Sequence, residues 1–153
     1  MQSIDSAELE KLSDTLKSVL DEAPEKKRDL HEQLAELAKQ EVDSQISASL
    51  GGDSGKIAEW QETHVGSGGG YAAIRASSES TGANSPGAIT NYLENGHTIR
   101  SPSGHAQHYK PAIHEPYVEG RHFYQASRSA LESKAIAAAQ RFADQMAERI
   151  EHG

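Results

Sequence analysis

Two nearby stretches, Tyr92-Leu-Glu-Asn-Gly-His-Thr-Ile-Arg100 and Tyr117-Val-Glu-Gly-Arg-His-Phe-Tyr124, decide how the rest of the chain is interpreted. Each contains one glycine, Gly96 in the first and Gly120 in the second, and glycine permits sharp turns that other residues resist. The runs between these turns look extended and border on prolines, which suits edge strands or an irregular arm. We therefore predict an extended β-arm over 97–119, hinged at a glycine on either side.

Helices are predicted on both sides of this arm. A short helix is expected over 86–96, where Asn95-Gly96 is a strong turn signal. A long amphipathic helix is expected over 120–151, with one apolar stripe formed by Tyr124, Leu131, Ala135, Ala138, Phe142, Met146 and Ile150. A helix of about 30 residues spans roughly 45 Å. Since so small a core cannot cover that length, one end is expected to project or to pack on a neighbour.

The first 50 residues are predicted to form a helical hairpin. Ala23-Pro24 is expected to end a first helix, because proline suits the first turn of a second one. The first helix has apolar residues at helical spacing, namely Leu9, Leu12, Leu16, Val19 and Leu20. The second has a stripe of Leu30, Leu34, Leu37, Ala38, Val42 and Ile46. We expect these side chains to pack in the core; a coiled-coil dimer is the alternative, although the stripe covers few heptads.

Residues 53–77 change character and predict a β-hairpin. Ile57 to Val65 and Tyr71 to Ser77 are β-like runs, and five residues rich in glycine, 66–70, separate them. This loop is not a phosphate-binding loop, because no Gly-Lys-Ser or Gly-Lys-Thr follows it. The predicted strands are grouped rather than alternating with helices, which indicates an α+β fold over a single domain, 1–153.

Composition and charge narrow the class of protein. Hydrophobic residues make up 35% of the chain, below the usual ~45–50%, so the core is expected to be thin and to need a partner surface. The net charge of -8 disfavours binding to DNA phosphates, although an acidic lining would let DNA slide past. There is no cysteine, no apolar signal segment and no run long enough to span a bilayer. We expect the protein to be made in a cytoplasm and to have no membrane partner.

Five of the eight histidines gather in or beside the predicted arm: His97, His105, His108, His114 and His122. Imidazole is a common metal ligand, so a metal-dependent enzyme is one hypothesis. However, no His-Glu-x-x-His pattern and no carboxylate at a familiar spacing completes a zinc site. No Gly-x-Ser-x-Gly elbow or paired carboxylates predict hydrolase chemistry either. We therefore expect no catalysis, no cofactor and no metal, and interpret these histidines as polar residues of an interface.

The two stretches resemble motifs of a family of phage proteins. Members of the putative tail-component family of lambda-like and related long-tailed phages, which are neck or tail-completion proteins, show a Tyr-Val-Glu-x-Gly-His or Tyr-Val-Glu-x-Gly-Thr turn. A variable loop and a Val-x-Gly-Arg-x-(Phe or Met) motif then lead into a long C-terminal helix. Here Tyr92 to His97 resembles the first motif and Val118 to Phe123 the second.

This resemblance implies a structural virion protein that forms a homo-oligomeric ring, expected to be six-fold, at the head–tail junction. Its partners would be head-closure and tail proteins, DNA would pass through the ring without sequence-specific binding, and assembly would occur in the bacterial cytoplasm. The interface and structural residues expected are Tyr92, Glu94, Gly96, His97, Arg100, Gly120, Arg121, His122 and Phe123. Glu94 and Arg121 are expected to form an ion pair at the base of the arm. A host-directed adaptor whose acidic face mimics DNA is a third hypothesis.

Overall fold

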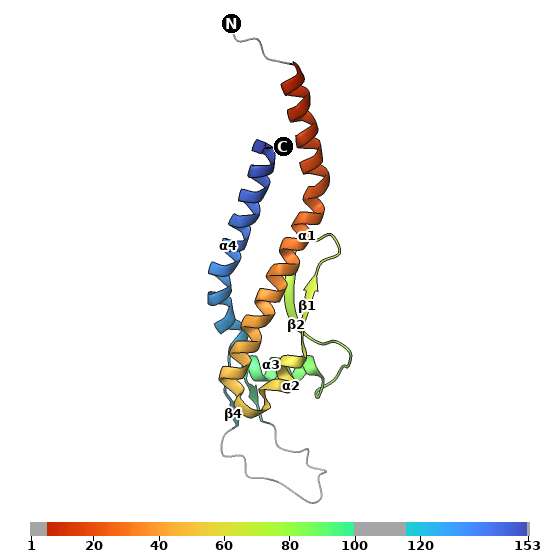
Figure 1. Cartoon of the computed structure of the whole chain (residues 1–153). Coiled ribbons are helices and arrows are strands. Elements are labelled where there is room, and N and C mark those ends of the chain that lie inside the picture. The colour runs from red at the N-terminus through yellow and green to blue at the C-terminus, as the bar shows by residue number, and fades with distance from the viewer. Residues whose placement is uncertain (1–5, 100–115, 153) are drawn as a thin grey trace, which may run out of the picture. The chain divides into compact units, whose positions relative to one another are not determined.

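The computed structural model describes residues 6–99 and 116–152 (Figure 1). Its elements, in chain order, are α1 (Ser6–Leu50), η1 (Gly51–Asp53), α2 (Ser54–Glu59), β1 (Gln61–Val65), β2 (Ala72–Ala76), α3 (Pro86–Asn95), β3 (His97–Thr98), β4 (Tyr117–Val118) and α4 (Phe123–His152). Strands β1 and β2 form one two-stranded sheet, and β3 and β4 form another. The predicted α+β class is confirmed.

The chain divides into two compact units. The first comprises Met1–Gln40, Thr63–Ile74 and Ser129–Gly153, and the second comprises Glu41–Glu62 and Arg75–Arg128. Each unit is therefore built from segments that are far apart in the sequence. None of the helices in the described ranges, 6–99 and 116–152, is both long enough and apolar enough to cross a membrane.

The helical hairpin predicted over 1–50 is wrong, because α1 is one continuous helix with Pro24 inside it. Proline removes one hydrogen bond to the carbonyl four residues earlier, which here belongs to Leu20. Pro24 is exposed and Leu20 is 70% exposed, so water can solvate the carbonyl that has lost its partner. The residues on both sides of Pro24 favour a helix, and the loss of one bond does not end it.

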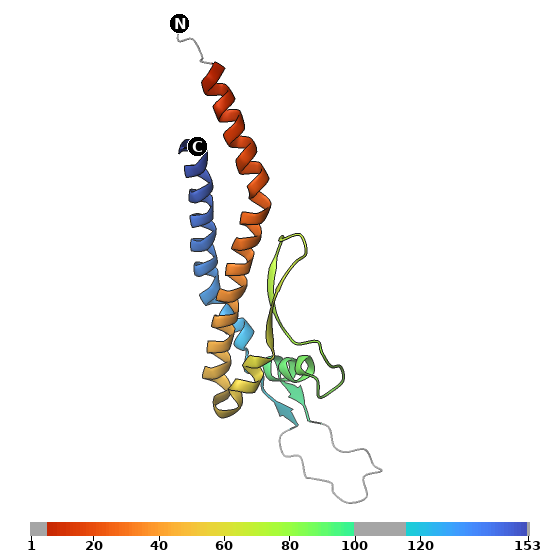
Figure 2. The ribbon, with the colours of Figure 1, turned by 45° about the vertical axis from the view of Figure 1, so that its right-hand side comes forward.

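In the first unit, α1 and α4 lie side by side and antiparallel (Figures 1 and 2). Arg149, near the end of α4, donates a hydrogen bond from Nη2 to Glu22 Oε1 of α1 at 2.9 Å, and this links the two helices. The stripe predicted for α4 is confirmed from Leu131 to Met146, whose members are buried or half-buried. Ile150, predicted on the same stripe, is 39% exposed.

The core position predicted for the first leucines of α1 is wrong. Leu9, Leu12, Leu16 and Leu20 are 53%, 45%, 41% and 70% exposed, whereas Val19 is buried. Two features explain this exposure: the four leucines lie about a third of a turn from Glu22, which meets α4, and the two helices differ in length. After Arg149 only three residues of α4 remain, but α1 begins 16 residues before Glu22. Much of the start of α1 therefore has no α4 surface to pack against.

The predicted β-hairpin is confirmed, with a shorter first strand than expected. At its tip, Gly66 N–H donates to the Tyr71 carbonyl at 3.0 Å, and at its base Ser77 N–H donates to the Trp60 carbonyl at 2.7 Å. The strand expected from Ile57 begins only at Gln61, because 54–59 form the short helix α2. Ile57 is buried in that helix. The side-chain amide of Gln61 donates a hydrogen bond to the Ile57 carbonyl at 2.9 Å, which gives this carbonyl at the helix end a partner.

The second unit contains the short helix that the sequence predicted over 86–96. Ser85 caps the start of α3 by accepting a hydrogen bond from Ala88 N–H at 3.2 Å, and Pro86 occupies the first turn. Gly96 ends the helix with a φ of 77°. The ends of the predicted 97–119 arm are extended, and they form an antiparallel pair that the sequence did not predict, with His97 opposite Val118 and Thr98 opposite Tyr117. Residues 100–115 lie outside the described ranges.

Candidate functional site at the junction of the two motifs

The two glycines of the motifs lie against each other in the second unit. A Cβ atom added to Gly120 would lie 2.7 Å from Asn95 C and 2.8 Å from Gly96 N, and closer still to the Glu94 carbonyl oxygen. A Cβ atom on Gly96 would lie 2.5 Å from the Val118 carbonyl oxygen and 2.8 Å from Gly120 N. Nearly all these neighbours are backbone atoms, which cannot rotate away. Glycine at both positions therefore allows the backbone around Gly96 to contact the backbone around Gly120, in addition to permitting the turns. We call this contact the glycine junction.

Hydrogen bonds surround the glycine junction. Arg121 N–H donates to the Leu93 carbonyl at 2.6 Å, and His122 N–H donates to the Glu94 carbonyl at 3.1 Å. Tyr117 adds a hydrogen bond from its hydroxyl to the Asn95 carbonyl at 3.1 Å. These bonds satisfy carbonyls at the C-terminal end of α3, which have no partner inside the helix.

Glu94 caps the start of α4. Its carboxylate accepts hydrogen bonds from Tyr124 N–H at 2.9 Å and from Gln125 N–H at 3.2 Å. A carboxylate is stabilised there both by the unpaired N–H groups and by the positive end of the helix dipole. The predicted ion pair between Glu94 and Arg121 is wrong: Glu94 is only 8% exposed and turned to the helix start, while the Arg121 side chain is exposed.

A buried polar network continues from this cap. The Tyr124 hydroxyl donates to Gln61 Oε1, and Gln61 Nε2 donates to Thr90 Oγ1 at 3.4 Å. Gln61 and Thr90 are 1% and 3% exposed. Burial, and to a lesser degree the negative charge of Glu94, raises the pKa of Tyr124 to about 12. The hydroxyl is therefore a stable proton donor at neutral pH, and the network ties β1, α3 and α4 together.

The remaining predicted site residues occupy different environments. Phe123 is 1% exposed and belongs to the core, so its role here is structural. Tyr92 is 38% exposed, and its ring lies 5.2 Å from that of His97, which is half-buried. His122 is exposed and has a φ of 52°, an unusual conformation for a residue other than glycine. Arg100 lies outside the described ranges.

An exposed rim borders the glycine junction. It consists of Ile99, Tyr117, Val118, Glu119, Arg121 and His122, which line a shallow groove of about 590 Å³. Ile99, Tyr117 and Val118 are 39%, 53% and 40% exposed, which is high for apolar side chains. Such a mixture of aromatic, aliphatic and arginine side chains is typical of protein–protein contacts.

Sequence reasoning missed Gln61 and Tyr117, which both contribute hydrogen bonds to the site. Tyr117 was visible as part of the second motif, but nothing in its neighbours showed that its hydroxyl reaches Asn95. Gln61 carried little signal: it is a polar residue in the middle of the predicted strand from Ile57 to Val65. Because its partners Thr90 and Tyr124 are far away in the sequence, only the tertiary structure reveals its role.

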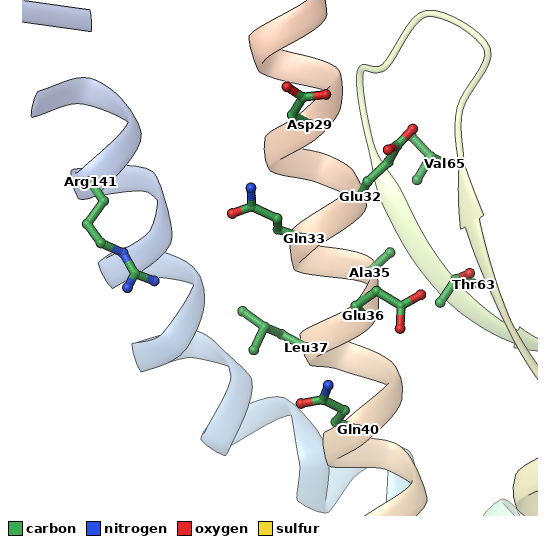
Figure 3. A pocket seen from close by; sticks show the side chains of 10 residues that line it. All are labelled: Asp29, Glu32, Gln33, Ala35, Glu36, Leu37, Gln40, Thr63, Val65 and Arg141. Atoms are coloured by element: carbon green, nitrogen blue, oxygen red, sulfur yellow. The ribbon is translucent and has the colours of Figure 1, made fainter. Parts of the chain in front are cut away.

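A groove in the first unit has a different character (Figure 3). It has a volume of about 880 Å³ and is lined by Asp29, Glu32, Gln33, Ala35, Glu36, Leu37, Gln40, Thr63, Val65 and Arg141. Figure 3 shows Asp29, Glu32 and Glu36 projecting from successive turns of α1 and Arg141 projecting from α4. The carboxylates are spread along the helix rather than converging on one point, as a metal site or a general acid–base pair would require.

Within 6–99 and 116–152 no three His, Cys, Asp or Glu residues are grouped so that they could hold a metal ion. Of the histidines weighed above, His105, His108 and His114 lie outside these ranges. Comparison of the chain with protein-family models, with curated proteins and with solved structures finds no match.

Proposed function

We propose that this chain is a structural, non-enzymatic subunit of a tailed-phage particle that forms a homo-oligomeric ring at the head–tail junction. In this role it joins or completes the tail and contacts the adjacent head-closure and tail proteins. DNA passes through the ring without sequence-specific contacts, as the net charge of -8 permits. The protein is assembled in the bacterial cytoplasm and ends in the virion.

The glycine junction is the observation that carries the proposal. The two motifs that resemble those of phage neck and tail-completion proteins are separated by about 20 residues, yet Gly96 and Gly120 lie in contact. A pair of motifs that forms one structural unit is a more specific resemblance than two independent short strings. The rim beside it, with exposed Ile99, Tyr117 and Val118, is a surface suited to a neighbouring subunit.

The rim supports a lateral contact of the kind that closes a ring. Cyclic rings use two different surfaces of each subunit, so one patch need not match itself. Within the rim and its surroundings, we propose that the exposed side chains of Tyr92, Arg121 and His122 contact the neighbouring subunit. The buried residues Glu94 and Phe123 hold the rim in its conformation.

Electron microscopy of the purified protein and mass spectrometry of purified particles test this proposal. We expect rings in negatively stained images and the chain among the proteins of intact particles. An Arg121→Glu variant should lose rings and fail to enter particles, because it reverses a charge on the rim. Arg128→Glu, an equal change at an exposed position of α4 outside the rim, is the matched control. A chain that is strictly monomeric and absent from particles overturns the proposal.

A further inference from the structure

The start of α1 carries an apolar surface that the described structure leaves open. Leu9, Leu12, Leu16 and Leu20, which we call the leucine ridge, follow one side of the helix. With 3.6 residues per turn, the ridge lies roughly a third of a turn from Glu22, the residue that bonds α4. Packing of α1 on α4 therefore does not cover it. The exposed fractions of the four leucines amount to about two whole side chains per copy.

Charges on the edge of the ridge indicate what covers it. Glu10 and Lys17 lie two turns apart on the same edge of α1, within about 20° of each other around the helix. Lys17 lies 3.6 Å from Asp14, but its side chain is still 72% exposed. In an antiparallel pair of copies, Leu20 of the second copy can lie opposite Leu9 of the first. In this register Lys17 of the second copy lies beside Glu10 of the first, and Glu10 of the second copy lies beside Lys17 of the first.

We propose that the leucine ridge is a self-association surface whose occupant is the leucine ridge of a second copy of this chain, packed antiparallel. Leu12 and Leu16 of one copy then meet Leu16 and Leu12 of the other, and two Glu10–Lys17 pairs fix the direction. A parallel two-fold arrangement would turn this edge of the two helices to opposite sides of the contact, so no Glu10–Lys17 pair would form. Antiparallel helices also use the same surface on both copies, as a two-fold contact requires.

This contact is distinct from the rim and does not depend on the proposed function. A two-fold contact does not by itself close a ring, so it adds to the lateral contact rather than replacing it. The buried surface is small compared with that of permanent dimers, and the association should therefore be reversible and depend on protein concentration.

Sedimentation and light scattering of the purified protein over a range of about 1 to 300 µM test the contact. Glu10→Lys or Lys17→Glu alone should weaken association about tenfold, because each turns two attractive pairs into repulsive ones. The double variant Glu10→Lys, Lys17→Glu should restore it. Leu16→Ser with Leu20→Ser should weaken it about a hundredfold or more. Helix content by circular dichroism verifies that each variant is folded, since all four side chains are exposed.

The matched control is Ile136→Ser, which removes a 64% exposed aliphatic side chain of α4 that is not part of the ridge. The chain has no cysteine, so introduced thiols report the direction of pairing. Mixing Glu10→Cys with Lys17→Cys should give the mixed disulfide in preference to either self-paired one. A protein without ridge-dependent association, a double charge swap no better than the single ones, or a preference for self-paired disulfides overturns the proposal. An equal effect of Ile136→Ser also overturns it.

Discussion

Replacing Gly120 by alanine should separate the two motifs. The added Cβ would lie 2.7 Å from Asn95 C and 2.8 Å from Gly96 N, distances that carbon and nitrogen atoms do not adopt without bonding. The φ of Gly120 is not in the left-handed region, so the penalty is steric rather than conformational. Because all three close neighbours are backbone atoms of the end of α3, relief requires that the whole junction opens.

The expected loss of stability follows from what the junction holds. Overpacking of this kind costs about 1–3 kcal/mol. Opening also weakens the hydrogen bonds from Tyr124 N–H and Gln125 N–H to the Glu94 carboxylate, and a helix cap contributes about 0.5–2 kcal/mol. Together these effects give about 3 kcal/mol, which lowers the melting temperature by roughly 6–12 °C for a chain of this size.

Thermal unfolding followed by circular dichroism measures this loss, and hydrogen exchange of a peptide covering 121–126 shows whether the junction has opened. Gly87→Ala is the matched control, because a Cβ there meets nothing within 4 Å. Gly87 lies in the first turn of α3, where alanine favours the helix, so the control should melt at or slightly above the wild-type temperature. A Gly120→Ala protein that melts within about 2 °C of wild type, with normal protection of 121–126, refutes this reasoning.

Three further substitutions test other parts of the fold. The pKa of Tyr124 is raised in the folded state, so its stabilising contribution is complete below pH 10 and is lost as the pH rises towards about 12. Across this range, the free energy of unfolding measured in urea should fall more steeply for wild type than for Tyr124→Phe. Pro24→Ala should raise the free energy of unfolding by about 1–3 kcal/mol in the same assay, since it restores one helical hydrogen bond, and an unchanged or lower value would contradict this. Gly66→Ala should lower the melting temperature less than Gly120→Ala, because its close neighbour is the rotatable Tyr71 ring rather than backbone.

Local signals in the sequence predicted the elements that depend on local chemistry. Ser85-Pro86 and Asn95-Gly96 mark both ends of α3, and the structure begins and ends that helix there. Pro24 is the exception. The usual rule makes proline a helix boundary, but the rule assumes that the freed carbonyl has no other partner. On a helix surface exposed to water that assumption fails, and the sequence alone does not tell which surface is exposed.

The burial of apolar residues was predictable only where both packing helices were long enough. The α4 stripe from Leu131 to Met146 was correct because α1 faces it along its whole length. The leucine ridge of α1 has an equally regular spacing, yet it is exposed because it lies about a third of a turn from the side that meets α4, and because α4 ends near Glu22. Spacing shows that a helix has an apolar side, but the partner for that side depends on the relative lengths and register of elements far apart in the sequence.

The structure brings together the two motifs that the sequence singled out, but the contacts between them differ from the predicted ones. Opposite charges on Glu94 and Arg121, both next to turns, predicted an ion pair. A carboxylate can instead accept two N–H groups at a helix start while remaining buried, whereas burial of an arginine beside it would remove a second charge from water. The structure therefore places Glu94 inside and leaves Arg121 exposed on the rim.

This arrangement explains how a very short strand pair can define the base of the 97–119 segment. Strands β3 and β4 have two residues each, too few to hold together without further support. Their register is instead supported by the glycine junction, by the Tyr117 hydroxyl on Asn95 and by the Glu94 cap on α4. Apart from Tyr117, whose hydroxyl is itself one of these contacts, the exposed side chains of the rim can therefore vary without loosening the base. Rim substitutions such as Arg121→Glu should therefore alter association while leaving the melting temperature within about 2 °C of wild type, in contrast to Gly120→Ala.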